Sequence, residues 1–215
     1  MEIYFTSDLH FGHKNILNHE PKRWELIRTT QLEAIKKVMF NDGLTNEEIY
    51  NMTDDIWEEY KKKTNNEYIK IHDEKLIKKW NETVKAEDIV YILGDFSWYK
   101  GEKTNEILKQ LNGKKILIIG NHDSNFLTDK KFDKSLFEEI CYYKELKYNN
   151  QYFILFHYPI AEHNGKTNEA IHLYGHIHTM NPELEKSLLP LAYNVGIDRN
   201  NYELVNIKKF VKEKK

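Results

Sequence analysis

Residues 3–10 read IYFTSDLH, a short apolar run that passes directly into an acidic and an imidazole side chain. A run rich in Ile, Tyr and Phe that stops at polar residues is typical of a buried β-strand. In an extended segment, residues two positions apart share one face, so Asp8 and His10 can point into the same cavity. We therefore expect a strand at Ile3 to Thr6, followed by a pair of chemically active residues.

Four more apolar runs of the same kind follow along the chain, and each predicts a strand. They are Ile89 to Leu93, Lys115 to Ile119, Tyr152 to Phe156 and Ala170 to Tyr174. Between the runs, apolar residues recur three and four positions apart, which is typical of helices. These helical patterns cover Thr29 to Phe40, Glu74 to Val84 and Thr104 to Leu111. The near-continuous apolar character of the strands suits burial on both faces.

The segment from Asn41 to Ile71 differs from its surroundings because it is rich in charged residues. Its apolar residues still recur at helical spacing, so we expect helices inserted on the surface at about residues 41–71. A solvated helical excursion explains this pattern more simply than a lid that selects the substrate. The chain has 215 residues, enough for one domain, and we expect residues 1–215 to form a single domain that carries the insert.

Composition narrows the classes of function. The chain has 32 Lys and Arg residues against 34 Asp and Glu residues, a net charge of −2, so no general basic field favours nucleic acid. A single cysteine, Cys141, excludes an intramolecular disulfide. The first residues do not resemble a signal peptide, and no apolar run is long enough to span a bilayer. We therefore expect a cytoplasmic protein without a membrane partner.

Residue types that commonly bind metal ions follow all five predicted strands. They are Asp8 with His10, Asp95, Asn121 with His122, His157, and His176 with His178. Residues just past the ends of buried strands can converge on one crevice, and stiff strands hold them with precision. A mixture of carboxylate, imidazole and amide ligands suits Mn, Fe, Zn, Co or Ni better than Ca or Mg.

Each of these features has a simpler explanation when it is taken alone. An Asp and a His two apart are common in turns, Gly94-Asp95 is an ordinary turn dipeptide, and Asn121 also fits a turn. A histidine after an apolar run, such as His157, is more often a hydrogen-bonded core residue than a ligand. Five such features in order, each at a strand end, are nevertheless difficult to attribute to coincidence.

Taken together, these motifs resemble those of the calcineurin-like metallophosphoesterase family. The ordered motifs of that family are D-x-H, G-D, G-N-H, a lone H and G-H-x-H, and this chain has a counterpart of each between Asp8 and His178. The words SDLHFGHKNI, ILGDFSW, IGNHD and YGHIH are similar to those of small bacterial and phage members. The resemblance implies an α+β fold, a four-layer α/β/β/α sandwich of two mixed sheets flanked by helices.

The resemblance also implies two divalent metal ions as cofactors, with manganese favoured and Fe, Zn, Ni or Co as alternatives. It places Asp95 between both ions, and it places His122 outside the ligand sets, where it assists the leaving oxygen. The remaining implied ligands are Asp8, His10 and His178 for the first ion and Asn121, His157 and His176 for the second.

The chain departs from the family pattern in two places. Many members carry a second Asp after the G-D motif, where this chain has Phe96-Ser97-Trp98. That Asp is not a metal ligand in the family, so the expected metal site is unaffected. The second departure is the long spacing between the first two motifs, which the helical segment fills, and it leaves the substrate open.

Phosphoester chemistry explains why two cations would be needed. A phosphoester is anionic and repels hydroxide, whereas two metal ions neutralise the phosphoryl oxygens and lower the pKa of a bridging water. The resulting hydroxide attacks phosphorus in line with the leaving oxygen. We therefore predict a hydrolase of phosphodiesters or phosphomonoesters, with a small nucleotide-like phosphoester favoured as the substrate.

Two other functions stay open at this point. The same metals would also serve a nuclease acting on DNA or RNA, although the balanced net charge disfavours it. A catalytically inactive interaction module is the third hypothesis, and the presence of every expected ligand and of His122 counts against it. The sequence does not identify a protein partner.

Three residues near the motifs are further candidates for the site. His13 fits a phosphate contact and a structural role equally well. Arg23 is a candidate for binding an anionic substrate, although a surface arginine is the simpler interpretation. Trp98 follows Asp95 closely, so its ring is placed to stack against a base or an aromatic leaving group.

Overall fold

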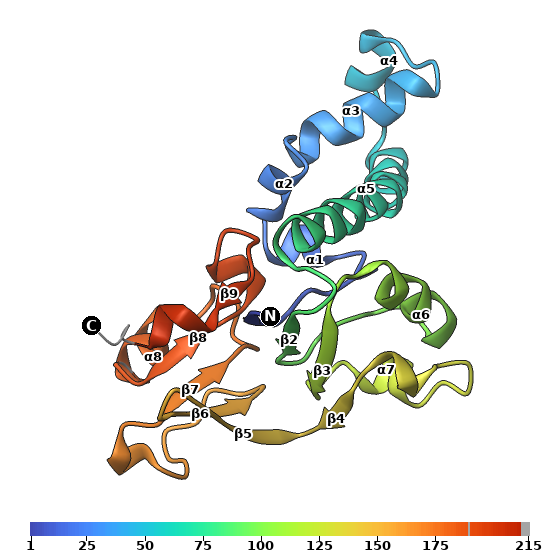
Figure 1. The fold of residues 1–215 in the computed structure, drawn as a ribbon. Helices are drawn as coiled ribbons and strands as arrows, with labels where there is room; N and C mark the ends of the chain where they lie inside the picture. The colour runs from blue at the N-terminus through green and yellow to red at the C-terminus, as the bar shows by residue number, and fades with distance from the viewer. Residues whose placement is uncertain (189, 212–215) are drawn as a thin grey trace. The chain divides into compact units, whose positions relative to one another are not determined.

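The computed structural model describes residues 1–188 and 190–211 (Figure 1). The chain divides into two compact units. We call Met1–Phe11 together with Leu76–Lys215 the sheet unit, and Gly12–Lys75 the helical unit. Each unit contains a cluster of buried apolar side chains, so each has a hydrophobic core of its own.

The larger sheet of the sheet unit has five strands in the order β4-β3-β2-β1-β9. The strands β1 (Ile3–Thr6), β2 (Ile89–Ile92), β3 (Lys114–Ile118) and β4 (Glu139–Cys141) pair in parallel. The strand β9 (Val205–Asn206) pairs antiparallel to β1 at one edge. Because β1, β2 and β3 are parallel neighbours, their carboxyl ends meet at one edge of the sheet.

The second sheet has four strands in the order β5-β6-β7-β8. The strands β5 (Tyr143–Tyr148) and β6 (Gln151–Phe156) form an antiparallel pair. The strands β7 (Ile171–Tyr174) and β8 (Ala192–Asn194) continue the sheet in parallel with β6. Both sheets therefore mix parallel and antiparallel pairs.

Apolar side chains from the two sheets share one core. Phe5 and Leu93 contribute from the first sheet, and Phe153, Leu155 and Leu173 contribute from the second. All five are fully buried, and the rings of Phe5 and Phe153 lie 6.1 Å apart. Burial of each such side chain contributes roughly 1.5–3 kcal/mol, so this shared core holds the sheets together.

Helices flank the two sheets within the sheet unit (Figure 1). They are α6 (Gly101–Gln110), α7 (Ser124–Leu127) and α8 (Pro182–Leu188), with short 3₁₀ helices η1 (Lys134–Leu136), η2 (Lys166–Asn168), η3 (Ile197–Arg199) and η4 (Ile207–Phe210). The face of α6 that carries Thr104, Ile107 and Leu108 is buried, as its apolar spacing requires. The predicted α+β arrangement of two mixed sheets flanked by helices is confirmed.

The helical unit is built from short helices and the first part of a long one. Its elements are α1 (Ile16–His19), α2 (Arg23–Leu26), α3 (Gln31–Asn41), α4 (Asn46–Tyr50) and the start of α5 (Asp54–Thr83), which ends within the sheet unit. Capping boxes begin α3 at Thr30 and α4 at Thr45, where the Thr hydroxyl and the Glu three residues later satisfy amides of the first turn. Among the described residues, no helix is long and apolar enough to cross a bilayer.

The predicted elements agree well with these bounds. All five predicted strands form, and their ends differ from the prediction by one residue at most. The segment expected to hold inserted helices at 41–71 lies within the helical unit, which begins much earlier, at Gly12. The helix expected at Glu74 to Val84 forms as the last part of α5.

Four strands, β4, β5, β8 and β9, were not predicted from the sequence. The strand β5 is rich in charged and tyrosine residues and alternates between exposed and partly buried positions, because it lies at a sheet edge. The strand β4 has three residues, as does β8, and β9 has two. Runs this short carry too little periodicity to be recognised without their pairing partners.

A buried histidine on β7 makes the stability of the sheet unit sensitive to pH. The side chain of His172 is fully buried, and its Nε2 accepts a hydrogen bond from the backbone N–H of Ile160 at 3.2 Å. Its ring nitrogens also lie 3.1 Å from the carbonyl oxygens of Ile154 and Tyr158, which favour a charged ring. Burial outweighs both oxygens and lowers the pKa of His172 to about 4.

We predict that His172 lowers the free energy of unfolding as the pH falls from about 6.5 to 4. The unfolded chain takes up a proton on this ring in that window while the folded chain does not, so protonation favours unfolding by up to roughly 3 kcal/mol. Urea unfolding of metal-free protein at pH 7.5 and pH 4.5 measures this loss. The loss should be smaller in His172→Gln, and equal losses in the two proteins would contradict the prediction.

Candidate metal centre

The strand ends bring the predicted motif residues to one region of the sheet unit. Asp8 follows β1, Asp95 follows β2, and Asn121 follows β3, which are adjacent parallel strands. Two further loops, after β6 and β7 of the second sheet, carry His157 and His176. Strand order therefore explains why residues 168 positions apart meet, as in the hydrogen bonds from the His176 amide to the Asp8 carboxylate.

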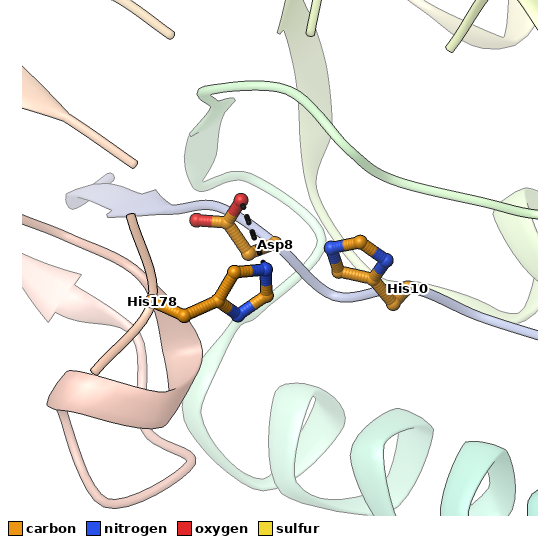
Figure 2. Close-up of side chains that lie close together, drawn as sticks. All are labelled: Asp8, His10 and His178. Carbon is orange, nitrogen blue, oxygen red and sulfur yellow. Dashed lines mark ion pairs between the residues drawn. The ribbon is translucent and has the colours of Figure 1, made fainter. Parts of the chain in front are cut away.

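One group of possible metal ligands consists of Asp8, His10 and His178. Figure 2 shows the three side chains gathered between the loops that follow β1 and β7. One ligand atom from each lies within 4.8 Å of the others, and all three residues are buried. His178 Nε2 lies 4.0 Å from Asp8 Oδ1. This combination of one carboxylate and two imidazoles is a typical donor set for a transition metal.

A second group consists of Asp95, His157 and His176, whose ligand atoms also lie within 4.8 Å of one another. Asn121 adds its amide oxygen to this group, because Asn121 Oδ1 lies 2.9 Å from His157 Nε2. An amide, a carboxylate and two imidazoles thus surround a second position that could hold a cation.

The carboxylate of Asp95 lies between the two groups. Its Oδ2 is 3.8 Å from His10 Nε2 on one side and 3.6 Å from His157 Nε2 on the other. Asp95 exposes only 2% of its surface. A single carboxylate shared between two ligand groups is the arrangement that two neighbouring cations require, because it screens their mutual repulsion.

Hydrogen bonds behind the ligands fix which imidazole nitrogen faces the site. His157 Nδ1 lies 2.7 Å from the carbonyl oxygen of Leu93, so Nδ1 carries the proton and Nε2 is left to bind a cation. His178 Nδ1 likewise lies 2.8 Å from Asp198 Oδ2, whose side chain is almost fully buried. Carboxylate or carbonyl partners of this kind orient metal-binding histidines.

The electrostatics of the first group favour an occupying cation. Burial raises the pKa of Asp8, because the carboxylate is removed from water, and burial lowers the pKa of His176 in the second group. Ser7 Oγ donates to Asp8 Oδ2 at 2.6 Å, and the His176 amide donates to both Asp8 oxygens at 3.0 Å. A divalent cation would favour the charged carboxylate and the neutral imidazoles at once, so the residues present fit a metal.

Asp123 organises the site although it was not among the predicted ligands. Its buried carboxylate accepts hydrogen bonds from the backbone N–H groups of Gly120, Asp95 and Phe96, at 2.7, 3.0 and 2.8 Å respectively. Burial and the nearby Asp95 carboxylate raise the pKa of Asp123 to about 6. Asp123 is the last residue of the motif IGNHD. Its hydrogen bonds, which join the loop after β3 to the loop after β2, are visible only in the folded structure.

The backbone is strained at most of the expected ligands. Positive φ angles, which non-glycine residues rarely adopt, occur at Asp8, His10, Asp95, His176 and His178. Such conformations cost of order 1–3 kcal/mol each and persist only where the surrounding structure enforces them. Their concentration at five of the seven expected ligands supports a functional site.

Close packing around the ligands also requires glycine at specific positions. A Cβ added to Gly120 would lie 2.5 Å from Asp95 Oδ1, and one added to Gly175 would lie 2.5 Å from Asp8 Oδ2. Both contacts are far shorter than van der Waals separation. The glycines of the G-N-H and G-H-x-H motifs therefore make room for the carboxylates.

His122 is exposed at the site, and the partly buried Trp98 lies against it. The backbone N–H of His122 donates to Asp95 Oδ1 at 2.9 Å, while the residue as a whole is exposed. The Trp98 ring lies 4.1 Å from the His122 ring and 5.0 Å from the His10 ring, between centroids. Trp98 thus lies against the site as expected, in contact with two of its histidines.

The two residues suggested for substrate binding belong to the helical unit. His13 is partly exposed, and its ring lies 5.7 Å from that of His19. Arg23 is fully buried, with Nη1 3.2 Å from His72 Nε2. The interpretation of Arg23 as a surface arginine is therefore wrong: α2 is amphipathic and presents both Arg23 and Trp24 to the interior.

Comparison with known proteins identifies the family. The family described as calcineurin-like phosphoesterase matches residues 1–213, nearly the whole chain. The chain belongs to this family. Calcineurin-like phosphoesterases are metal-dependent hydrolases of phosphoester bonds, and the two ligand groups of this member agree with such chemistry.

Several similar proteins have no assigned function. The chain is 28% identical to the uncharacterised protein MJ1445 of Methanocaldococcus jannaschii, over 98% of this chain and 90% of that protein. It is 30% identical to the Gene 66 protein of Mycobacterium phage L5 over 56% of this chain and 39% of that protein. The crystal structure of the protein of unknown function AQ665 from Aquifex aeolicus has the same fold, with a TM-score of 0.59, 23% identity, and coverage of 97% and 96%.

We predict that Asp198→Ala weakens metal binding at the first group. Loss of the carboxylate frees the His178 ring to rotate and to change tautomer, which typically costs 10- to 100-fold in metal affinity. Manganese titration followed by calorimetry should show one of two binding events weakened. Asp198→Asn keeps a hydrogen-bond acceptor and should recover part of the affinity, whereas parental affinity in Asp198→Ala would exclude the orienting role.

Proposed function

We propose that this protein hydrolyses a phosphodiester or phosphomonoester with the aid of two divalent metal ions. The observation that supports this most directly is the Asp95 carboxylate, which lies 3.8 Å from His10 Nε2 and 3.6 Å from His157 Nε2 and so joins two ligand groups. A small nucleotide-like phosphoester is the favoured substrate, since Trp98 offers an aromatic surface beside the site.

Seven residues would hold the metal ions in this proposal. Asp95 would contact both ions; Asp8, His10 and His178 would complete one ligand set, and Asn121, His157 and His176 the other. When bound, the ions would supply positive charge to the phosphoryl oxygens and lower the pKa of bound water. With four imidazoles among the seven ligands, the set suits manganese, iron, zinc, nickel or cobalt better than magnesium.

Residues outside the ligand sets orient the ligands, and one of them would donate a proton. The Leu93 carbonyl and the Asp198 carboxylate hold His157 and His178 in the tautomer that leaves Nε2 for metal. His122 is exposed, and its backbone is tied to Asp95, so its imidazole can reach a substrate at the metal centre. There it would donate a proton to the leaving oxygen as the phosphoester bond breaks.

We predict that removal of metal abolishes hydrolysis and that manganese restores it better than magnesium. The nitrogen-rich ligand set gives the physical reason, since magnesium prefers an all-oxygen environment. Chelator-treated protein is assayed on bis-p-nitrophenyl phosphate, before and after each metal is added. Full activity in the presence of chelator would refute the proposal.

The substrate panel distinguishes the related functions. It contains phosphomonoesters, cyclic and linear dinucleotides, and single-stranded DNA and RNA, all tested on the manganese-loaded protein. Turnover of small esters alone supports the favoured substrate class, and cleavage of polynucleotides alone identifies a nuclease. Two tightly bound metal ions without any turnover would point to an interaction module.

We predict that His122→Ala separates chemistry from metal binding. Because His122 lies outside both ligand sets, metal content should stay at the parental value. The rate on an ester with a poor leaving group should fall about 10²–10⁴-fold, since that group needs a proton as it departs. Nitrophenolate leaves without protonation, so its ester should lose less activity.

Two outcomes would change the role of His122. Equal losses on both esters would indicate that His122 positions the phosphate and does not donate a proton. Loss of bound metal, measured by atomic emission in the same sample, would show that His122 acts as a ligand. Trp98→Phe serves as the matched control, because it preserves an aromatic neighbour for His122 while altering the shape of the site.

A further inference from the structure

The helical unit contains a large cavity that is made entirely of its own residues. The cavity has a volume of about 1110 Å³, and residues of α1, α2, the start of α3 and α5 line it. This volume exceeds the roughly 300–1,000 Å³ of typical small-molecule pockets. None of the lining residues belongs to the proposed metal ligands.

The charge on the cavity wall suits an anionic ligand. Lys14, Lys61 and Lys62 line it, together with Glu25 and Glu58. Lys61 is paired with Glu58 at 2.7 Å. In the part of the chain that the structure describes, no carboxylate lies within ion-pair distance of Lys14 or Lys62. Two unpaired ammonium groups at one cavity favour a phosphate, which accepts charge-assisted hydrogen bonds.

Two amide oxygens in the cavity lack a hydrogen-bond partner. Asn65 and Asn66, consecutive residues of α5, both line the cavity. The Oδ1 atom of each is buried and accepts no hydrogen bond within the described structure, and Asn65 exposes only 9% of its surface. A buried acceptor without a donor destabilises the protein. A turn of either side-chain amide toward the cavity would bring its oxygen to the N–H or O–H groups of a ligand.

An apolar wall completes the cavity. Leu17, Pro21 and Trp24 line it beside the polar groups, and Trp24 is held by ring contact with Tyr68 at 5.8 Å. The cavity thus combines cationic, hydrogen-bond-accepting and apolar surfaces. A nucleotide carries the complement of all three: a phosphate, amino and hydroxyl donors, and the flat face of a base.

We propose that this cavity binds a nucleotide, with the phosphate at Lys14 and Lys62 and the amino or hydroxyl donors at Asn65 and Asn66. A free mononucleotide and the end of a single-stranded nucleic acid present the same chemistry. The residues of this site are all different from those of the proposed metal centre.

Binding is measured on the full-length protein in chelator, where hydrolysis is suppressed and no metal holds a phosphate elsewhere. Calorimetry with AMP, CMP, an eight-nucleotide single-stranded DNA and inorganic phosphate gives one dissociation constant for each. Both nucleotide forms should bind at least tenfold more tightly than phosphate. Tighter binding of the oligonucleotide than of AMP and CMP identifies a strand end as the source, and the reverse order identifies a free nucleotide.

Lysine variants test the phosphate contacts. Lys14→Ala and Lys62→Ala should each weaken nucleotide binding about tenfold, the equivalent of one charge-assisted hydrogen bond. Lys36→Ala and Lys37→Ala, on the exposed face of α3, remove the same charge from the same unit outside the cavity and should leave binding unchanged. Equal losses in both pairs would mean that general charge attracts the ligand, which would overturn the site.

The variant Asn65→Leu gives the sharpest test because its two effects have opposite signs. Leucine removes the unsatisfied acceptor, so the melting temperature of the ligand-free protein should rise or stay constant. Nucleotide binding should weaken at least fivefold, since the donor on the ligand loses its partner. Parental affinity in Asn65→Leu, or nucleotides that bind no better than phosphate, would overturn the proposal.

Discussion

The buried carboxylate of Asp123 accepts hydrogen bonds from the amides of Gly120, Asp95 and Phe96 and thereby fixes the two loops that build the centre of the site. With those loops fixed, the Asp95 side chain lies between two groups of imidazoles. A displacement of either loop would move the one carboxylate that both groups share. The rest of the site depends on this contact, because the outer ligands only complete sets that Asp95 has already joined.

A site of this kind lowers the stability of the folded chain. Positive φ angles at five expected ligands and buried carboxylates oppose folding when no cation is present. The shared core of the two sheets offsets these costs, with Phe5 and Phe153 among its fully buried members. Bound metal would contribute further, since binding to the folded state alone stabilises it. The scaffold and the site are therefore energetically linked.

The helical unit follows a different design. Its core is formed by Leu17, Trp24, Val38 and Tyr68 with their neighbours, and two of its helices, α3 and α4, begin with capping boxes. None of the residues that line its cavity is among the proposed metal ligands.

The five strands that carry the motifs could be predicted from local sequence, whereas the α+β class and the expected ligands came from the resemblance of the ordered motifs to a family. The signals for the strands are local. An apolar run predicts a buried strand, and Asp, His or Asn directly after it indicates a candidate metal ligand. The contact between Asp198 and His178 and the burial of Arg23 became visible in the folded chain alone. The tertiary structure also decided where the edge strands pair and which residues form the helical cavity. Those features depend on contacts between residues far apart in the chain, and hydrophobic periodicity in a short window carries no information about such contacts.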